Sequence, residues 1–599
     1  MVGFTIGCGT AVREKRLLDP RQGDVEDDAS STMQRSVLAI AGSLLAEISV
    51  PKLLFALAFS IVLPATLLGL APLLVTAWLA KASRSVAELT GAGAVVLIIV
   101  LAIGWVGWRP LFRSVEANFW SLNALAIQPG YILWREALRH LAERTLGSRA
   151  NTDKLVRLRA ASSAGAGGIV CLLAILVAAF VWPTSRWVGT VTDLFFVQGL
   201  IVPALANAVV VVSIYLAAAS LVWGIADATM EQPRDIRAFG AGPLGGRLWR
   251  VAHLSDLHVV GERYGFRIES GRAGPRGNDR LDRVLARLES VHSAQPLDLI
   301  LITGDLTDAG RSTEWAEFLD LLARHPVIAK KVVALPGNHD VNIVDRANPA
   351  RLNLPFSPGK RLRQIRTLSA LAAVQGDRVH VVDQKSGELA HSLADSLAEH
   401  QPNIEEFART SSLRLSAALG SVWNSQFPMI LPPHADDGLG VAILNSNAET
   451  HFSFTNALGM ITAEQMHRLA MAIGKFPRAF WIIGLHHHLM EYPMPVSAFS
   501  ERVGTALING SWFVRKLRPF AQRCIAMHGH RHIDWIGACD GLKIVSAPSP
   551  VMGVRDDRPT YFHIHTLAAG TDGRLQLLPP ERVSIAGIEH GAFAAKTVV

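Results

Sequence analysis

Four long uncharged stretches constrain the fold of this chain more than any other feature of its sequence. They lie at about 53–80, 91–108, 163–182 and 200–225. A helix needs about 20 apolar residues to cross a bilayer, and inside lipid only helices and closed barrels satisfy every backbone polar group. We therefore expect a membrane domain of about four transmembrane helices at 53–226, preceded by a polar cytoplasmic segment at 1–52.

The composition agrees with a chain that lies partly in lipid. Half of the residues are hydrophobic, 18% are charged and the mean hydropathy is +0.28. Buried helices of a large soluble core are the alternative, but four uncharged runs of this length are rare in soluble proteins. The net charge of +8 comes from basic residues that flank the apolar stretches. This placement favours contact with an anionic membrane surface over nucleic acid.

The distribution of Lys and Arg predicts the orientation in the membrane. Six lie before the first stretch and nine between 109 and 159, against three in the two intervening turns. Because basic residues stay on the cytoplasmic side, we expect both termini and the C-terminal half there, at the inner membrane if the cell is bacterial. A second crossing within 194–225 would reverse that side. Residues 131–146 predict an amphipathic helix, lying either in the headgroup region or against the soluble domain.

Beyond a linker at 227–246, short apolar strands alternate with helices. This pattern predicts an α/β domain at 247–580, followed by a tail at 581–599. A polar helical stretch at about 350–425 is expected to form an inserted cap. The expected strands lie at 248–254, 297–303, 331–335, 441–445, 479–485, 523–527, 542–545 and 561–567.

Five clusters of residues whose types commonly bind metals follow expected strands in the C-terminal half of the chain. They are Asp256 with His258, Gly304-Asp305, Gly337-Asn338-His339-Asp340, His486-His487-His488, and Gly529-His530 with His532. Carboxylates, imidazoles and one amide oxygen suit Mn, Fe, Co, Ni or Zn better than the all-oxygen cages of Ca or Mg. One bridging aspartate, with three further ligands for each ion, describes a two-metal site for phosphoryl chemistry.

In this order the five clusters resemble the calcineurin-like metallophosphoesterase family over about residues 250–570. The resemblance implies a four-layer α/β fold, in which two central sheets are flanked by helices. It also implies two divalent ions, Mn, Fe or Zn, with Mn expected to be the most effective in vitro. Asp256, His258 and His532 would hold one ion, Asp305 would bridge, and Asn338, His486 and His530 would complete the other.

The same resemblance assigns catalysis to His339 and Asp340. His339 would protonate the leaving oxygen or stabilise the transferred phosphoryl group, and Asp340 would orient its ring. His486 is preferred to His487 as a ligand because the family places the ligand directly after the strand, and Asp308 would support its loop. Basic residues at 263–280 and 351–366 border the site. They either recognise phosphate or, as we favour, form a solvated or lipid-facing basic surface.

These features predict a membrane-anchored phosphohydrolase that cleaves phosphodiester or pyrophosphate bonds. Lipid-linked phosphates, cyclic nucleotides and nucleic acid remain open as substrate classes. Membrane lipids are expected partners and nucleic acid is not. The alternatives are a nucleotide or cyclic-nucleotide phosphodiesterase moored to the membrane, or a non-catalytic scaffold or sensor. The complete set of ligand-type residues argues against the last.

Overall fold

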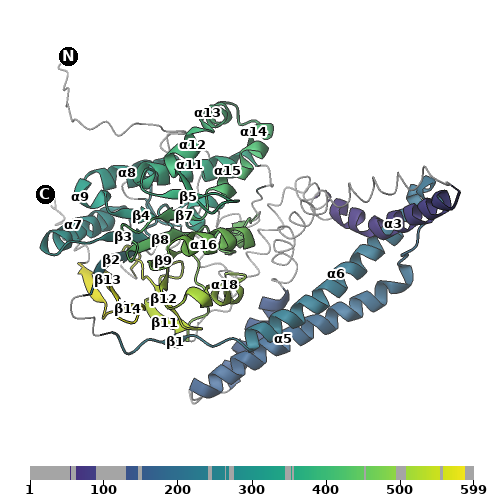
Figure 1. Cartoon of the computed structure of the whole chain (residues 1–599), viewed down its shortest axis with the longest axis horizontal. Coiled ribbons are helices and arrows are strands. Elements are labelled where there is room, and N and C mark those ends of the chain that lie inside the picture. The colour runs from purple at the N-terminus through teal and green to yellow at the C-terminus, as the bar shows by residue number, and fades with distance from the viewer. Residues whose placement is uncertain are drawn as a thin grey trace, which may run out of the picture.

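The computed structural model divides the chain into long helices and an α/β body (Figure 1). It describes residues 54, 58, 62–88, 130–145, 152–240, 246–262, 265–268, 276–344, 353, 357–450, 453–493, 507–553 and 558–586. The expected N-terminal segment at 1–52 and the expected second apolar stretch at 91–108 lie outside the described residues.

Among the described residues of the first half, three helices are long and apolar enough to cross a membrane, judged by length and composition. They are α3 (Leu63–Glu88), α5 (Thr152–Val181) and α6 (Val197–Ala228). Their surfaces carry apolar side chains that are mostly exposed, such as Phe180 (85%) and Val222 (65%). The helix α6 is continuous, so the run at 200–225 contains no turn at which a second crossing could begin.

The close approach of α5 and α6 depends on glycine. A Cβ atom on Gly167 would lie 2.6 Å from the carbonyl oxygen of Ser220, and one on Gly224 would lie 3.0 Å from that of Ser163. Small residues let helix backbones approach in a membrane, where association depends on van der Waals contact rather than on the hydrophobic effect. The two glycines therefore set the spacing of this helix pair.

Residues 130–145 form a helix that packs against α5 and α6. Tyr131 and Ile132 are buried against Ala166 of α5 and against the partly buried residues of α6 around Trp223. The same helix leaves Leu141 60% exposed. It thus joins the helical part of the molecule while presenting an apolar side outward.

The α/β body contains two sheets, as the resemblance implied. The six-stranded sheet has the order β14-β13-β2-β3-β4, with β15 paired to β13. Its strands are β2 (Leu248–Leu254), β3 (Leu299–Ile302), β4 (Val332–Ala334), β13 (Thr560–Ala569), β14 (Leu575–Leu577) and β15 (Glu581–Ile585). Strands β2, β3 and β4 run parallel, so their carboxyl ends lie at one edge.

The nine-stranded sheet has the order β1-β11-β12-β10-β9-β8-β7-β5-β6. Its strands are β1 (Arg234–Asp235), β5 (His380–Val382), β6 (Leu389–Ser392), β7 (Met429–Leu431), β8 (Leu439–Ile443), β9 (Phe480–Gly484), β10 (Cys524–His528), β11 (Trp535–Cys539) and β12 (Leu542–Ser546). Its centre, β8-β9-β10-β12, is parallel.

Alternation along the central strands builds two cores. Ile482 of β9 and Ile525 of β10 join residues of the six-stranded sheet in the core between the sheets. Trp481 and Ile483, which flank Ile482 on β9, face a second core on the outer side. Successive strand residues point to opposite faces, so a fully apolar strand can serve both cores at once.

Helices complete the layers. The core between the sheets extends to α7 (Asp279–Ala294), α8 (Ser312–Ala323) and α11 (Pro358–Gln375), and the second core includes α16 (Ala463–Lys475) and α18 (Gly510–Leu517). The smaller helices are α9 (Pro326–Ala329), α10 (Asn338–Val341), α12 (Leu393–Ala398), α13 (Gln401–Thr410), α14 (Leu413–Ala418) and α15 (Gly420–Ser425).

Three segment boundaries differ from the sequence-based expectation. The stretch at 350–425 is mostly helical, but β5 and β6 pair into the nine-stranded sheet and α11 is largely buried, so it is no separate cap. The linker at 227–246 contains β1, which pairs antiparallel with β11. The tail begins with β15, which pairs with β13. Among these strands β1, β6 and β15 lie at sheet edges, where few apolar side chains are needed, so their sequences gave little signal.

We expect Gly167→Ala to lower the melting temperature of the full-length protein in detergent by several degrees. The new methyl group would meet backbone atoms of Ser220 and Gly224, which cannot move as a side-chain tip can. Gly168→Ala is the matched control, because a Cβ atom there meets nothing within 4 Å. Equal melting temperatures for the two variants would contradict the proposed spacing role.

Candidate metal centre

The predicted ligands lie on loops at the carboxyl ends of five strands. Asp256 and His258 follow β2, Asp305 follows β3 and Asn338 follows β4. His486 follows β9, and His530 and His532 follow β10. The loops are tied by backbone hydrogen bonds, since the amide of Asp256 donates to Gly304 O (3.0 Å) and that of His258 to Asp305 O (3.0 Å).

These side chains form three overlapping groups whose ligand atoms lie within 4.8 Å of one another. The groups are Asp256-His258-His532, His258-Asp305-His339 and Asp305-His486-His530. Asp305 and His258 each belong to two groups. The first group contains the residues expected to hold one ion, and the third contains Asp305 with His486 and His530, which were expected at the other.

His486 joins the two sheets at this point. Its Nε2 atom lies 3.2 Å from Asp305 Oδ2, 3.0 Å from Asn338 Oδ1 and 3.1 Å from His530 Nδ1. Its Nδ1 atom is 2.8 Å from the carbonyl oxygen of Thr303, which fixes the ring. A carboxylate, an amide oxygen and two imidazoles therefore converge on one small volume.

The backbone at the candidate ligands is strained. Seven described residues other than glycine have a positive φ, and five of them are candidate ligands. The five are Asp256 (57°), His258 (45°), Asp305 (49°), His530 (75°) and His532 (52°). Side chains with a Cβ atom rarely adopt this region, and such strain clusters at functional sites. The strain is thus a second reason, independent of their chemistry, to treat these residues as candidate ligands.

Glycine permits the loops to approach one another. A Cβ atom on Gly337 would lie 2.1 Å from the amide nitrogen and from Oδ1 of Asp305, and one on Gly529 would lie 1.7 Å from Ser255 Oγ. No larger residue fits at either position without displacing a ligand loop. Gly337 and Gly529 are therefore required by the close approach of the loops that carry the candidate ligands.

His339 lies beside the candidate ligands and belongs to the group with His258 and Asp305. Its amide donates to Asp305 Oδ1 (2.8 Å), and its Nδ1 atom lies 2.6 Å from the carbonyl oxygen of Asp308. The His258 ring meets it edge-on, with the centroids 4.6 Å apart. Because Nδ1–H donates to a carbonyl, the lone pair of the neutral ring lies on Nε2.

The expected role of Asp340 in orienting His339 is wrong. Its Oδ1 atom accepts from the amide and the hydroxyl of Thr307 (2.8 and 2.6 Å), and its Oδ2 atom accepts from the amides of Gly337 (2.8 Å) and Leu306 (3.3 Å). These four donors engage both carboxylate oxygens. Asp340 thus holds the loops after β3 and β4 together, while Asp308 orients the ring through its main chain.

Burial and neighbouring charges together shift the pKa values of three groups in this site. Burial would raise the pKa of Asp305, but the imidazoles of His486 and His339 outweigh it and hold that pKa well below its ordinary value. Burial would lower the pKa of His486, but Asp305 raises it to about 9. Burial and the charge of Asp305 raise the pKa of Asp340 to about 6.

The residues present fit divalent ions of borderline softness. His258 Nε2 and His530 Nε2 are buried and have no hydrogen-bond partner among the described residues. A buried imidazole nitrogen without a partner is costly in a protein, but it is the atom that a metal ion requires. The donor set of carboxylate, imidazole and amide oxygen agrees with that fit.

Two further groups support the cluster. Asp308 Oδ1 lies 3.3 Å from His258 Nδ1, and its Oδ2 atom accepts from the amide of Ile268 (2.6 Å), so Asp308 supports its loop. The sequence analysis missed Ser446, whose hydroxyl accepts from the amides of His486 and His487 (both 3.1 Å). A lone serine after β8 gave no signal that could have identified it. His487 points to this hydroxyl through Nδ1 (2.9 Å) and lies outside the three groups.

Most of the described basic residues near the site are buried and do not form the solvated surface that we favoured, although Arg276 is exposed. Arg267 is buried and donates to the carbonyl oxygen of His258 (2.9 Å), and Arg280 is buried and donates to that of Val551 (3.1 Å). Arg366 is buried on α11 and donates to Gly310 O (3.0 Å). These guanidinium groups tie loops together, a use that their spacing in the sequence does not reveal.

Residues 250–407 match the model of the calcineurin-like phosphoesterase family. The match covers 158 of 599 residues and includes Asp256, His258, Asp305, Asn338 and His339. His486, His530 and His532 lie beyond it, and their place beside the others comes from the structure. The family match and the ligand groups together show a metal-dependent hydrolase.

Solved structures with similar folds share little sequence with this chain. One is named as a 5′-nucleotidase from Staphylococcus aureus in complex with alpha-ketoglutarate (12% identity, TM-score 0.31, 58% of this chain and 56% of that one). Another is a dimetal phosphatase from Danio rerio (12%, 0.32, 57% and 99%), and a third is the NAD nucleotidase of Haemophilus influenzae (11%, 0.29, 57% and 57%). The chain thus spans little more than half the length of the first and third.

Structural similarity at TM-scores this low does not support an inference about function. A comparison with curated protein sequences gives no match.

We expect Asp305→Asn to remove most bound metal and to abolish phosphodiester hydrolysis, because two of the ligand groups share this carboxylate. Elemental analysis of the purified full-length protein would measure the metal content. Asp377→Asn, an exposed position after α11, is the control and should keep both metal and activity. Normal metal content in the Asp305 variant would show that this carboxylate is no shared ligand.

Proposed function

We propose that this protein is a membrane-anchored phosphohydrolase with two divalent metal ions, which cleaves phosphodiester or pyrophosphate bonds. The observation that carries the proposal is the convergence of Asp305, His486, Asn338 and His530, with Asp256, His258 and His532 on the other side of Asp305. Seven side chains from five loops supply enough ligands for two ions that share one carboxylate.

When bound, the ions would polarise the phosphoryl oxygens and lower the pKa of a coordinated water. The protein holds the ligands for them in advance. His486 is fixed by Thr303, the loop of Asp305 is fixed through Asp340, and the amide of His530 donates to both oxygens of Asp256 (3.0 and 3.2 Å). Such preorganisation keeps the catalytic geometry without rearrangement during the reaction.

His339 is proposed as the general acid. With Nδ1–H directed at the carbonyl oxygen of Asp308, the ring in its imidazolium form would carry its second proton on Nε2 and deliver that proton to the leaving oxygen. Its amide bond to Asp305 keeps the ring beside the shared carboxylate. Because His339 also belongs to a ligand-type group, a role as a metal ligand is the competing assignment.

The membrane part supports a substrate that resides at the bilayer surface. Three apolar helices are more than a membrane anchor needs, since a single transmembrane helix already anchors a protein essentially irreversibly. The catalytic domain is held close to them, because the chain passes from α6 directly into β1 of the nine-stranded sheet. We place this domain on the cytoplasmic side on the basis of the Lys and Arg distribution.

We expect His339→Ala to lower kcat by about 10²–10⁴, the usual contribution of a general acid, while the bound metal stays near the wild-type level. Metal content and kcat would be measured on the same full-length preparation with a chromogenic diester. Loss of one ion together with activity would instead make His339 a ligand.

A vesicle experiment tests the membrane-borne substrate. The full-length protein would be reconstituted with a phospholipid substrate either in its own vesicles or in separate vesicles. We expect turnover to be at least about tenfold faster in the shared vesicles, because anchoring raises the effective concentration. A soluble diester should be hydrolysed equally in both preparations. Fast turnover of a soluble cyclic nucleotide, with no hydrolysis of any lipid, would instead favour a nucleotide phosphodiesterase that is merely moored to the membrane.

A further inference from the structure

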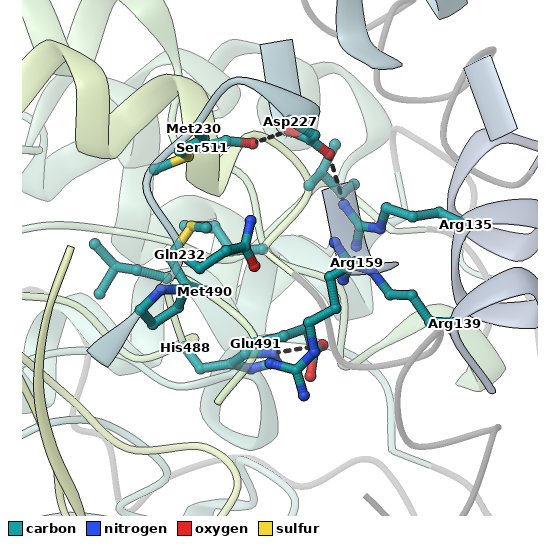
Figure 2. Close-up of a pocket in the computed structure, with 14 residues that line it drawn as sticks. Arg135, Arg139, Arg159, Asp227, Met230, Gln232, His488, Met490, Glu491 and Ser511 are labelled. Atoms are coloured by element: carbon teal, nitrogen blue, oxygen red, sulfur yellow. Dashed lines mark hydrogen bonds and ion pairs between the residues drawn. The ribbon is translucent and has the colours of Figure 1, made fainter. Parts of the chain in front are cut away.

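A pocket lies where the membrane helices meet the catalytic domain (Figure 2). One wall is formed by Arg135 and Arg139 of the 130–145 helix and by Arg159 of α5. Residues at and after the end of α6, including Asp227 and Gln232, form another wall, and the loop after β9 closes the pocket. The volume is about 570 Å³ including the space open to solvent.

The pocket borders the candidate metal centre. His488, which lines it, stacks on the ring of His530 with the centroids 6.1 Å apart and the planes at 13°. Glu491, which also lines it, pairs with Arg531 (3.0 Å), the residue between two candidate ligands. A molecule in this pocket would therefore lie one layer of side chains from the proposed reaction.

Charges around the pocket are paired. Each arginine that lines it has a carboxylate partner, and the same holds for Arg531. The pairs are Arg135 with Asp227 (2.9 Å) and Glu136 (2.9 Å), Arg139 with Glu136 (3.0 Å), Arg159 with Glu143 (3.4 Å) and Arg531 with Glu491 (3.0 Å). Among the described residues, four guanidinium groups thus face four carboxylates. A ligand with a large net charge would unbalance this network.

Two buried polar atoms of the lining have no hydrogen-bond partner among the described residues. They are Arg139 Nε, on a side chain 9% exposed, and His488 Nδ1, on a side chain 2% exposed. The arginine nitrogen can only donate. A neutral His488 that donates from Nε2 to Glu491 (3.3 Å) keeps an accepting lone pair on Nδ1. The residues that line the pocket thus leave one donor and one acceptor without a partner among the described residues.

We propose that this pocket binds the zwitterionic headgroup of a membrane phospholipid, a phosphodiester that carries an ammonium group. The phosphodiester oxygen would accept from Arg139, and the ammonium group would donate to His488 and lie near Glu491. A zwitterion supplies both missing partners and adds no net charge to a balanced network. The inference rests on the proposed function in one respect, because it names the class of substrate that the neighbouring metal centre would hydrolyse.

Binding can be measured separately from catalysis. Full-length protein in an uncharged detergent, with chelator present, would be titrated with glycerophosphoethanolamine, glycerophosphoglycerol and inorganic phosphate. We expect the zwitterion to bind about tenfold more tightly than either anion, a difference within the range of charge complementarity. Equal or tighter binding of an anion, or no binding of any probe, would overturn the proposal.

Variants locate the binding. Arg139→Gln removes the guanidinium Nε and should weaken binding of glycerophosphoethanolamine about tenfold or more. Because Arg139 also pairs with Glu136, Gln232→Trp provides a second variant that fills the pocket from the opposite wall without breaking an ion pair, and it should abolish binding. Arg144→Gln is the matched control, since Arg144 is exposed on the same helix. Undiminished binding in the Gln232 variant would place the ligand elsewhere.

A vesicle assay separates this inference from the proposed function. Vesicles of the neutral choline lipid would contain equal fractions of an ethanolamine lipid and a glycerol lipid, with Mn²⁺ present. Preferred hydrolysis of the ethanolamine lipid supports both proposals. Hydrolysis without headgroup preference contradicts the inference alone. Selective binding of glycerophosphoethanolamine with no hydrolysis of any phosphate ester contradicts the proposed function alone.

Discussion

The contact of Asp305 with His486 is the interaction on which the candidate site depends. Asp305 comes from the six-stranded sheet and His486 from the nine-stranded sheet, and their side chains meet 3.2 Å apart. Both groups are fully buried, which would be costly for a lone carboxylate. The carboxylate is stabilised because imidazoles surround it and the amide of His339 donates to it. The edge where the two sheets meet therefore holds the candidate site, beside the core between them.

Strain in the ligand loops follows from the same constraint. Five short loops must direct their side chains into one volume at the edges of two sheets, and extended backbone cannot turn sharply enough. Asp256 and Asp305 adopt positive φ for this reason, and Gly337 and Gly529 allow the loops to touch. The cores between and outside the sheets hold this strain in place, since their strands are almost completely buried.

The apolar helices are joined to the α/β body by polar contacts rather than by a loose tether. Asp227 at the end of α6 accepts from Tyr131 and Arg135 (2.9 Å each) and from Ser511 of α18 (2.5 Å). Arg159 of α5 donates to the carbonyl oxygens of Tyr492 and Pro493 (3.3 and 3.2 Å). The loop that begins with His486 is therefore in direct contact with α5, one of the apolar helices.

The sequence alone determined the α/β class, the apolar helices and the identity of the candidate ligands. These properties follow from local patterns: apolar runs, alternation along strands, and ligand-type residues directly after strands. Only the tertiary structure decided that β1, β5, β6 and β15 join the sheets, that Asp340 binds loop amides, and that Arg267 and Arg366 are buried. Each of these outcomes depends on partners far away in the chain, and a carboxylate or guanidinium group has the same local sequence pattern whether it faces water or a distant carbonyl oxygen.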